Sequence, residues 1–222
     1  MSIRTIINNR KHAEFKKVCF QLVFLAFANI AFGQGNKLKL GCEGGLSLAS
    51  MWINGEHQKL KVGGQFGLYT QIPLNETVSF KTGLYVEQKG AHINLYSLAG
   101  AESKAILALK YLTIPVLVRA DFGQEVRFFL NGGPYVGVLL QSYIKEEKTG
   151  NSETNTDRFK KTEWGLAGGV GLSFQLAKKF GLSFEIRDYL GISNNFKNTT
   201  GGGGTMRTNS IQFLLGVFYT VP

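Results

Sequence analysis

Long stretches of strictly alternating apolar and polar residues constrain this chain more than any other feature. The alternation is clearest over residues 78–89, where Phe80 and Leu84 share one parity and Lys81 and Glu87 share the other. A period of two places successive side chains on opposite faces of a β-strand. Comparable segments recur after residue 36 and predict eight strands. Their expected ranges are about 38–48, 61–73, 78–89, 107–122, 125–143, 161–176, 179–192 and 208–221.

The links between these segments alternate in length. Short turns are expected at Leu74-Asn75, Gly123-Gln124 and Ala177-Lys178, and long links at about 50–60, 90–106, 144–160 and 193–207. An even number of strands, with short turns at one end and long loops at the other, is typical of outer-membrane barrels. A β-structure crosses a bilayer only when closed, because every backbone donor and acceptor must be paired. The pattern predicts an all-β fold, an eight-stranded antiparallel up-and-down transmembrane β-barrel.

The first 33 residues have the organisation of an export signal. Basic residues such as Arg10 and Lys11 precede an apolar run over 18–32, and small residues stand before the Gly33-Gln34 bond. This order is typical of a cleaved secretory signal peptide. The run is short for a transmembrane helix, although an uncleaved anchor is the alternative. The expected division is a signal peptide at 1–33 and an outer-membrane β-barrel domain at 34–222.

Periodicity alone does not say which face of the barrel points outward. In a soluble, lipocalin-like barrel the apolar face would point inward. The outer face of a soluble barrel is usually rich in charge, whereas only 18% of this chain is charged. We therefore expect the apolar face to contact lipid and the polar face to line an interior in which charges of both signs pair. The residues expected in this charged network are Lys39, Glu43, Lys81, Glu87, Lys89, Arg119, Asp121, Arg127, Glu185 and Arg187.

Two further expectations concern the strands themselves. Pro115 has no N–H to donate to a ladder, so it predicts a bulge or irregular pairing. Aromatic residues near strand ends are expected to form girdles at the membrane interfaces. These aromatic residues are Trp52, Tyr69, Tyr143, Trp164, Tyr189 and Tyr219.

The chain shows no motif that carries catalysis or binds a cofactor. The two histidines after the signal, His57 and His92, lie near predicted loops without a partner at ligand spacing. A pairing of His92 with Glu87 or Ser97 would imitate a lipid-modifying enzyme, but nothing in the sequence fixes its geometry. We expect no catalytic, cofactor-binding or metal-binding residue and no enzymatic activity. Export, and the basic residues of the signal itself, argue against a nucleic-acid partner despite the formal net charge of +10.

Four short motifs resemble strands of one known family. They are Lys81-Thr82-Gly83-Leu84-Tyr85 with Gln88-Lys89-Gly90, Tyr111-Leu112-Thr113-Ile114-Pro115, Asn131-Gly132-Gly133-Pro134-Tyr135, and Trp164-Gly165-Leu166 with Gly168-Gly169-Val170-Gly171. Their order and spacing resemble the outer-membrane β-barrel (porin family, PorT-like) proteins of Bacteroidetes. The resemblance covers nearly all of residues 37–222 and implies a place in the outer membrane. The ending Val221-Pro222 departs from the terminal aromatic residue of many such barrels.

Together these features predict a non-enzymatic outer-membrane protein that is structural, adhesive or partner-binding through its extracellular loops. The alternatives are an accessory barrel of a protein secretion system, as the resemblance implies, and a soluble lipocalin-like carrier. An open diffusion pore is disfavoured, because side chains fill an eight-stranded barrel. The expected partners are outer-membrane lipid and envelope proteins.

Overall fold

The computed structural model describes residues 37–96, 102–146, 152–154, 156–197 and 204–222. The expected signal peptide, residues 1–33, lies outside these ranges, so the cleavage site and the domain boundary remain predictions. Within the described residues, no helix is long and apolar enough to cross a membrane.

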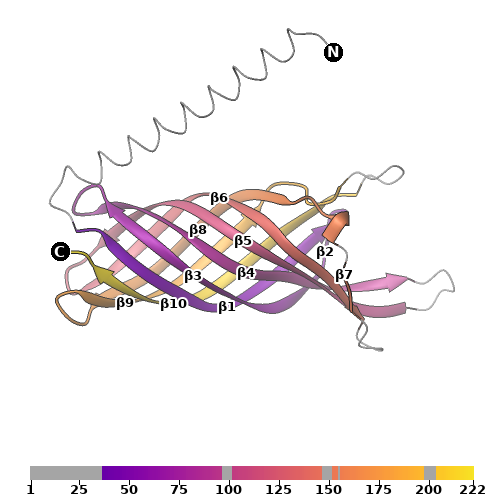
Figure 1. Ribbon diagram of the computed structural model, residues 1–222, viewed down its shortest axis with the longest axis horizontal. Helices are drawn as coiled ribbons and strands as arrows, with labels where there is room; N and C mark the ends of the chain where they lie inside the picture. The colour runs from indigo at the N-terminus through magenta and orange to yellow at the C-terminus, as the bar shows by residue number, and fades with distance from the viewer. Residues whose placement is uncertain (1–36, 97–101, 147–151, 155, 198–203) are drawn as a thin grey trace, which may run out of the picture.

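Eight long antiparallel strands form a closed barrel (Figure 1). They are β1 (Lys39–Ile53), β3 (Lys59–Pro73), β4 (Val78–Tyr96), β5 (Glu102–Phe122), β6 (Val126–Glu146), β8 (Thr162–Gln175), β9 (Phe180–Gly191) and β10 (Met206–Thr220). The short strands β2 (Glu56–His57) and β7 (Ser152–Thr154) and the 3-10 turn η1 (Thr156–Arg158) lie between them. Each long strand pairs with its neighbour in sequence, and β1 pairs with β10 from Lys39↔Thr220 to Ile53↔Met206. The predicted all-β, eight-stranded antiparallel barrel is confirmed.

The three short turns and both ends of the described barrel lie at the same end, which we call the turn end (Figure 1). In the first turn, the Asn75 side chain accepts hydrogen bonds from the backbone N–H groups of Thr77 and Val78, at 2.9 and 2.7 Å. Side chains of this kind stabilise a turn by mimicking its backbone hydrogen bonds. The opposite end, which carries the longer connections, is called the loop end.

The predicted extent of the long loops is wrong for 50–60 and 90–106, because the strands continue into them. The predicted links at about 144–160 and 193–207 lie close to the observed gaps between β6 and β8 and between β9 and β10. β1 reaches Ile53 and reverses at Asn54-Gly55, whose φ values are 53° and 87°. Such a two-residue turn matches the twist of a β-hairpin. β5 and β6 have 21 residues each, whereas a membrane-crossing strand needs only about 9–11. The strands therefore extend beyond the membrane at the loop end.

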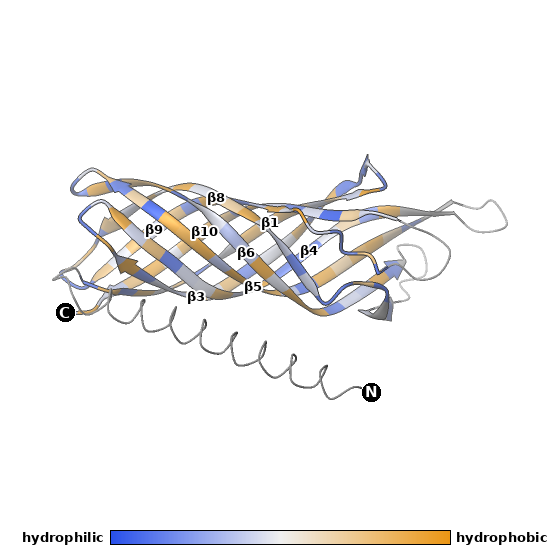
Figure 2. Cartoon of the chain, turned by 90° about the horizontal axis from the view of Figure 1, so that it is seen from above, coloured by the Kyte–Doolittle hydropathy of each residue, from blue (hydrophilic) through white to orange (hydrophobic). Residues whose placement is uncertain are grey.

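Large apolar side chains cover the outside of the barrel. Phe66, Leu84 and Leu215 are 61%, 56% and 69% exposed, whereas most charged residues of the opposite parity are buried. Figure 2 shows hydrophobic and hydrophilic residues alternating along the strands. An apolar surface that runs round a whole barrel requires a lipid environment. The lipocalin-like alternative, with its apolar face inward, is therefore wrong.

Two local expectations have different outcomes. Around Pro115 the ladder between β4 and β5 is interrupted between Thr82↔Val116 and Tyr85↔Thr113 but keeps its register, so the pairing is locally incomplete and the predicted bulge is not formed. The aromatic girdle is wrong for Tyr69 and Tyr189, which are buried inside the barrel at 4% and 0% exposure. Both tyrosines have the inward parity of their strands, and this parity outweighs their position along the strand.

Candidate functional site: a charged interior with two different mouths

Eight of the ten residues expected in the charged network are buried inside the barrel. They are Glu43, Lys81, Glu87, Lys89, Arg119, Asp121, Glu185 and Arg187. The other two, Lys39 and Arg127, share the inward parity but lie at the turn-end mouth, where Lys39 is half-buried and Arg127 is exposed. The structure therefore divides the expected set into interior groups and mouth groups.

Glu43, Lys81, Glu185 and Arg187 form a closed ring of ion pairs in the interior. The Lys81 ammonium lies 2.6 Å from Glu43 Oε2 and 2.8 Å from Glu185 Oε2. Arg187 reaches the other oxygen of each carboxylate, with 2.6 Å from Nη2 to Glu43 Oε1 and 2.6 Å from Nε to Glu185 Oε1. Each cation therefore bridges both carboxylates, and the ring carries no net charge.

Neutral side chains complete the surroundings of this ion-pair ring. The Asn131 amide donates to Glu185 Oε1 at 2.9 Å, and Arg187 donates to the Tyr189 hydroxyl at 3.2 Å. Lys81 lies 4.3 Å from the centre of the Tyr69 ring. Burying charges is unfavourable unless their remaining hydrogen-bonding capacity is satisfied. The ring satisfies this condition with residues of β1, β4, β6 and β9, so it joins separate walls of the barrel.

A second cluster, nearer the loop end, centres on Glu163 of β8. Its carboxylate receives hydrogen bonds from Lys89 at 2.6 Å, Tyr135 at 2.7 Å, Thr208 at 2.8 Å and Asn195 at 2.5 Å. Glu163 is missing from the charged network predicted from the sequence. The sequence nevertheless indicates that Glu163 faces inward, because its parity is opposite to that of the outward-facing Trp164. The other inward-facing residues of this strand are small.

Glu87 adds a further link between strands in the same region. Its Oε1 accepts hydrogen bonds from Ser210 and from Gln212, both at 2.6 Å. Its Oε2 lies 3.7 Å from the Lys89 ammonium. The carboxylate therefore joins β4 to β10 across the interior.

The loop end of the interior is apolar rather than charged. A buried hydrophobic cluster fills it, and Phe159 stacks on Phe196 with 5.8 Å between ring centres. The buried members of this apolar cap are Met51, Ala91, Leu107, Leu109, Tyr111, Leu139, Phe159 and Met206. Several come from segments predicted as loops, so this feature was not expected from the sequence.

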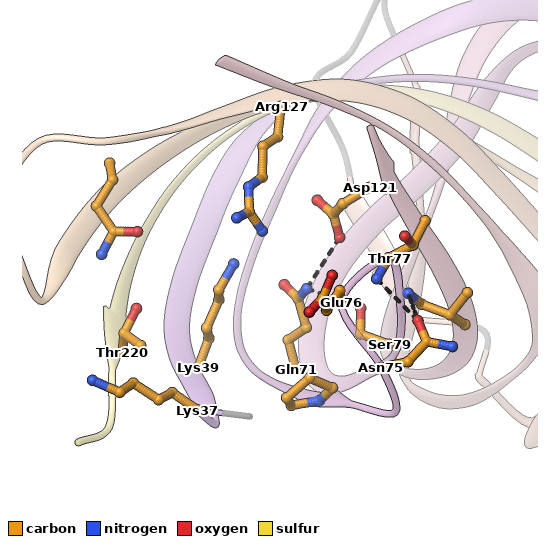
Figure 3. A pocket seen from close by; sticks show the side chains of 13 residues that line it. Lys37, Lys39, Gln71, Asn75, Glu76, Thr77, Ser79, Asp121, Arg127 and Thr220 are labelled. Carbon is orange, nitrogen blue, oxygen red and sulfur yellow. Dashed lines mark hydrogen bonds between the residues drawn. The ribbon is translucent and has the colours of Figure 1, made fainter. Parts of the chain in front are cut away.

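The turn-end mouth is a cavity of about 350 Å³ (Figure 3). At its edge, the Asp121 carboxylate accepts a fork of hydrogen bonds from Arg119, at 3.0 and 3.1 Å from Nε and 2.6 Å from Nη2. Lys39 and Arg127 also line the cavity. The arrangement differs from the ion-pair ring, because these two cations have no carboxylate between them (Figure 3).

The lipid-modifying arrangement of His92 with Glu87 is not formed. Glu87 lies inside the barrel, whereas His92 has the opposite parity on β4 and lines an outer groove with His57 and Lys59. Ser97 lies outside the described residues. Among the residues that the structure describes, no group of three or more His, Cys, Asp or Glu side chains is placed to hold a metal ion.

Comparisons with known proteins agree with this architecture. A major outer membrane protein from Thermus thermophilus is 11% identical, with 84% of this chain and 100% of that chain covered and a TM-score of 0.51. Neisserial surface protein A is 12% identical, with 82% and 96% covered and a TM-score of 0.49. OprG from Pseudomonas aeruginosa is 13% identical, with 84% and 97% covered and a TM-score of 0.48. At 11% identity, the likeness to the Thermus protein shows the fold alone.

Among curated proteins, no sequence matches the chain. Residues 27–197 match the family described as "Outer membrane protein beta-barrel domain". The match covers more than half of the chain and most of its barrel strands. The chain therefore belongs to this family of β-barrels and is a protein of the outer membrane.

Proposed function

We propose that this protein is a closed, non-enzymatic barrel that presents its extracellular end to partners outside the cell. Short turns of outer-membrane barrels face the periplasm and longer loops face outward, so the loop end is extracellular. The observation that carries the proposal is the ion-pair ring of Glu43, Lys81, Glu185 and Arg187, whose contacts of 2.6–2.8 Å cross the barrel interior.

The interior supports a structural role rather than a transport role. Side chains fill a barrel of eight strands, and here buried ion pairs bridge the walls below the apolar cap at the outer mouth. A solute would have to break several charged hydrogen bonds and then cross this cap. We therefore expect activity to lie on the two ends of the barrel and not in its lumen.

The extracellular end has the charge and shape of a display surface. The β4–β5 hairpin projects beyond the rest of the barrel (Figure 1). Exposed basic residues outnumber acidic ones among the described side chains at this end, where Glu56 and Glu153 are exposed carboxylates. The basic residues are Lys59, Lys104, Lys110, Lys145, Arg158, Lys160, Lys161, Lys197 and Arg207. A surface of one sign attracts ligands of the other, so the partner chemistry this end favours is anionic.

Planar-bilayer conductance tests whether the lumen is closed. The refolded wild-type barrel is expected to give no stable channel, whereas a wide porin inserted in the same way provides the positive control. Reproducible steady conductance from the wild-type protein would overturn the closed-barrel proposal.

Binding to a polyanion tests the display surface. The barrel in nanodiscs is expected to bind labelled dextran sulfate more tightly than neutral dextran, with an affinity that falls as salt rises. The triple variant Arg158→Gln/Lys160→Gln/Lys161→Gln should weaken this binding. Lys178→Gln/Lys179→Gln, at the periplasmic turn, is the control and should bind as wild type. Equal binding of both dextrans would contradict an anionic partner.

The PorT-like resemblance supports a second candidate, an accessory role in protein export. Its motif residues Lys81, Lys89 and Tyr135 all fill the barrel and take part in the buried network. Packing inside the barrel therefore accounts for these motif residues, and an export role needs independent support. Co-purification of the tagged barrel with periplasmic or outer-membrane export components would provide it. A null strain with unchanged secretion would remove this candidate.

A further inference from the structure

We propose that the periplasmic mouth of the barrel binds an oxyanion, a phosphate or carboxylate group, between Lys39 and Arg127. This site lies at the opposite end from the display surface and does not depend on that proposal. Its cavity of about 350 Å³ is lined by the ends of β1, β3, β4, β5, β6, β8 and β10 and by the turn at 74–77. The cavity is therefore a cup at the mouth rather than a groove on the lipid-facing wall.

Positive charge in this cup exceeds the negative charge available to balance it. Lys39 and Arg127 extend into the cavity toward one another (Figure 3), and Lys37 lines the same wall as Lys39. Asp121 already receives the guanidinium fork of Arg119. Glu76 on the turn is the remaining carboxylate of the cavity wall. Like charges that converge in a partly enclosed space repel one another and attract an anion.

A buried hydroxyl without a hydrogen-bond partner points to the same ligand. Thr220 is 8% exposed, and its Oγ1 has no hydrogen-bond partner although it lines the cavity. A buried polar atom without a partner is unfavourable. Thr220 is paired in register with Lys39, which is paired in turn with Gln71. The two residues therefore lie at one height on adjacent strands, and the Lys39 ammonium extends to 4.9 Å from the centre of the Phe218 ring, two residues from Thr220 on β10.

The donor set matches an oxyanion. Arginine offers two parallel N–H groups to a carboxylate or phosphate, lysine adds a compact charge, and threonine adds a single O–H donor. Gln71 gives its amide N–H groups to Ser79 and Asp121, at 2.9 and 3.5 Å. Its carboxamide therefore holds the wall in place, while Lys39, Arg127 and Thr220 are left to contact the ligand.

Isothermal titration of the refolded barrel in an uncharged maltoside detergent tests the site. Inorganic phosphate and citrate are the probes, and their relative affinity tells which oxyanion the cup prefers. The binding variants are Arg127→Gln, Lys39→Gln and Thr220→Val. Lys178→Gln is the matched control, because Lys178 is an exposed cation of the same end that does not line the cavity. The heat-dependent gel mobility of each variant confirms that it has folded.

Saturable binding of either probe by the wild-type barrel is expected. Each charge-removing variant should weaken it roughly tenfold or more, as the loss of a charged hydrogen bond predicts, and Thr220→Val should weaken it less. Lys178→Gln should leave it unchanged. The absence of saturable binding at millimolar phosphate and citrate would overturn the proposal. An equal loss in Lys178→Gln would also overturn it, because the attraction would then be a general charge effect.

Discussion

Glu43 shows how one carboxylate connects separate walls of the barrel. It lies on β1, and its two oxygens reach Lys81 on β4 and Arg187 on β9. Its side chain is 1% exposed, so water contributes little to its solvation. The stability of the ion-pair ring therefore depends on equal numbers of cations and carboxylates, and a change in one residue affects all four.

Glu43→Gln is expected to destabilise the folded barrel by about 3–5 kcal/mol, because it leaves two buried cations with one carboxylate. Urea unfolding in lipid vesicles measures the change. Glu125→Gln, on an exposed periplasmic turn, is the control and should stay within about 0.5 kcal/mol of wild type. Adding Lys81→Gln to Glu43→Gln restores neutrality and should recover part of the loss. Additive losses in the double variant would contradict a coupled ring.

Leu84→Arg tests the outward face at a single position. Leu84 faces lipid within the membrane part of β4 and is 56% exposed, and arginine at the bilayer midplane costs about 2–4 kcal/mol. Leu176→Arg, next to the periplasmic turn, is the matched control and should cost about 0–1 kcal/mol, because the membrane interface tolerates the charge. The folded fraction on an unheated gel reports both. Equal folding of the two variants would contradict the assignment of Leu84 to the membrane.

At the scale of elements, β4, β5 and β6 change character along their length. In β4, Phe80 and Leu84 face outward within the membrane, whereas Ala91 and Ile93, of the opposite parity, pack into the apolar cap beyond it. The alternation continues, but its faces exchange polarity. A prediction that assumes a polar inward face and an apolar outward face along the whole strand therefore mistakes this exchange of polarity for the start of a loop. The membrane part of each strand was therefore predictable, whereas the extracellular part and its core were not.

Phe159→Ala is expected to loosen the extracellular β6–β8 connection without opening the transmembrane barrel. Phe159 is 3% exposed and stacks on Phe196, and truncation of a buried phenylalanine costs about 3–5 kcal/mol. Limited trypsinolysis should therefore be faster at the neighbouring Arg158, Lys160 and Lys161, while heat-dependent gel mobility persists because local openings are separable from global unfolding.

The control for this experiment is Phe128→Ala, which removes a lipid-facing ring that is 63% exposed. It should leave the cleavage rate of the β6–β8 connection unchanged. Equal cleavage in Phe159→Ala and wild type would show that the apolar cap does not hold this connection.

At the scale of the whole molecule, closure decides which charges meet. Glu43 and Arg187 are 144 residues apart in sequence, and they meet because β1 pairs with β10 and β10 pairs with β9. Parity predicts that both side chains point inward, but their pairing depends on the stagger between strands, which no local pattern encodes. For the same reason, parity placed Lys39 and Arg127 in the interior set without showing that they lie at its mouth.

Gly45→Val tests closure at the seam between β1 and β10. A Cβ at position 45 would lie 1.8 Å from the backbone oxygen of Phe213 on β10, so the two strands could not keep their present approach. Gly64 on β3 is the control, because a Cβ there would meet only the Gly45 carbonyl oxygen, at 3.6 Å. On gels of unheated samples, Gly45→Val should lose the SDS-resistant folded band, because an unpaired edge in the bilayer leaves backbone groups unsatisfied, whereas Gly64→Ala should retain it. A normal band for Gly45→Val would show that the seam tolerates separation and that the barrel does not require this close contact to close.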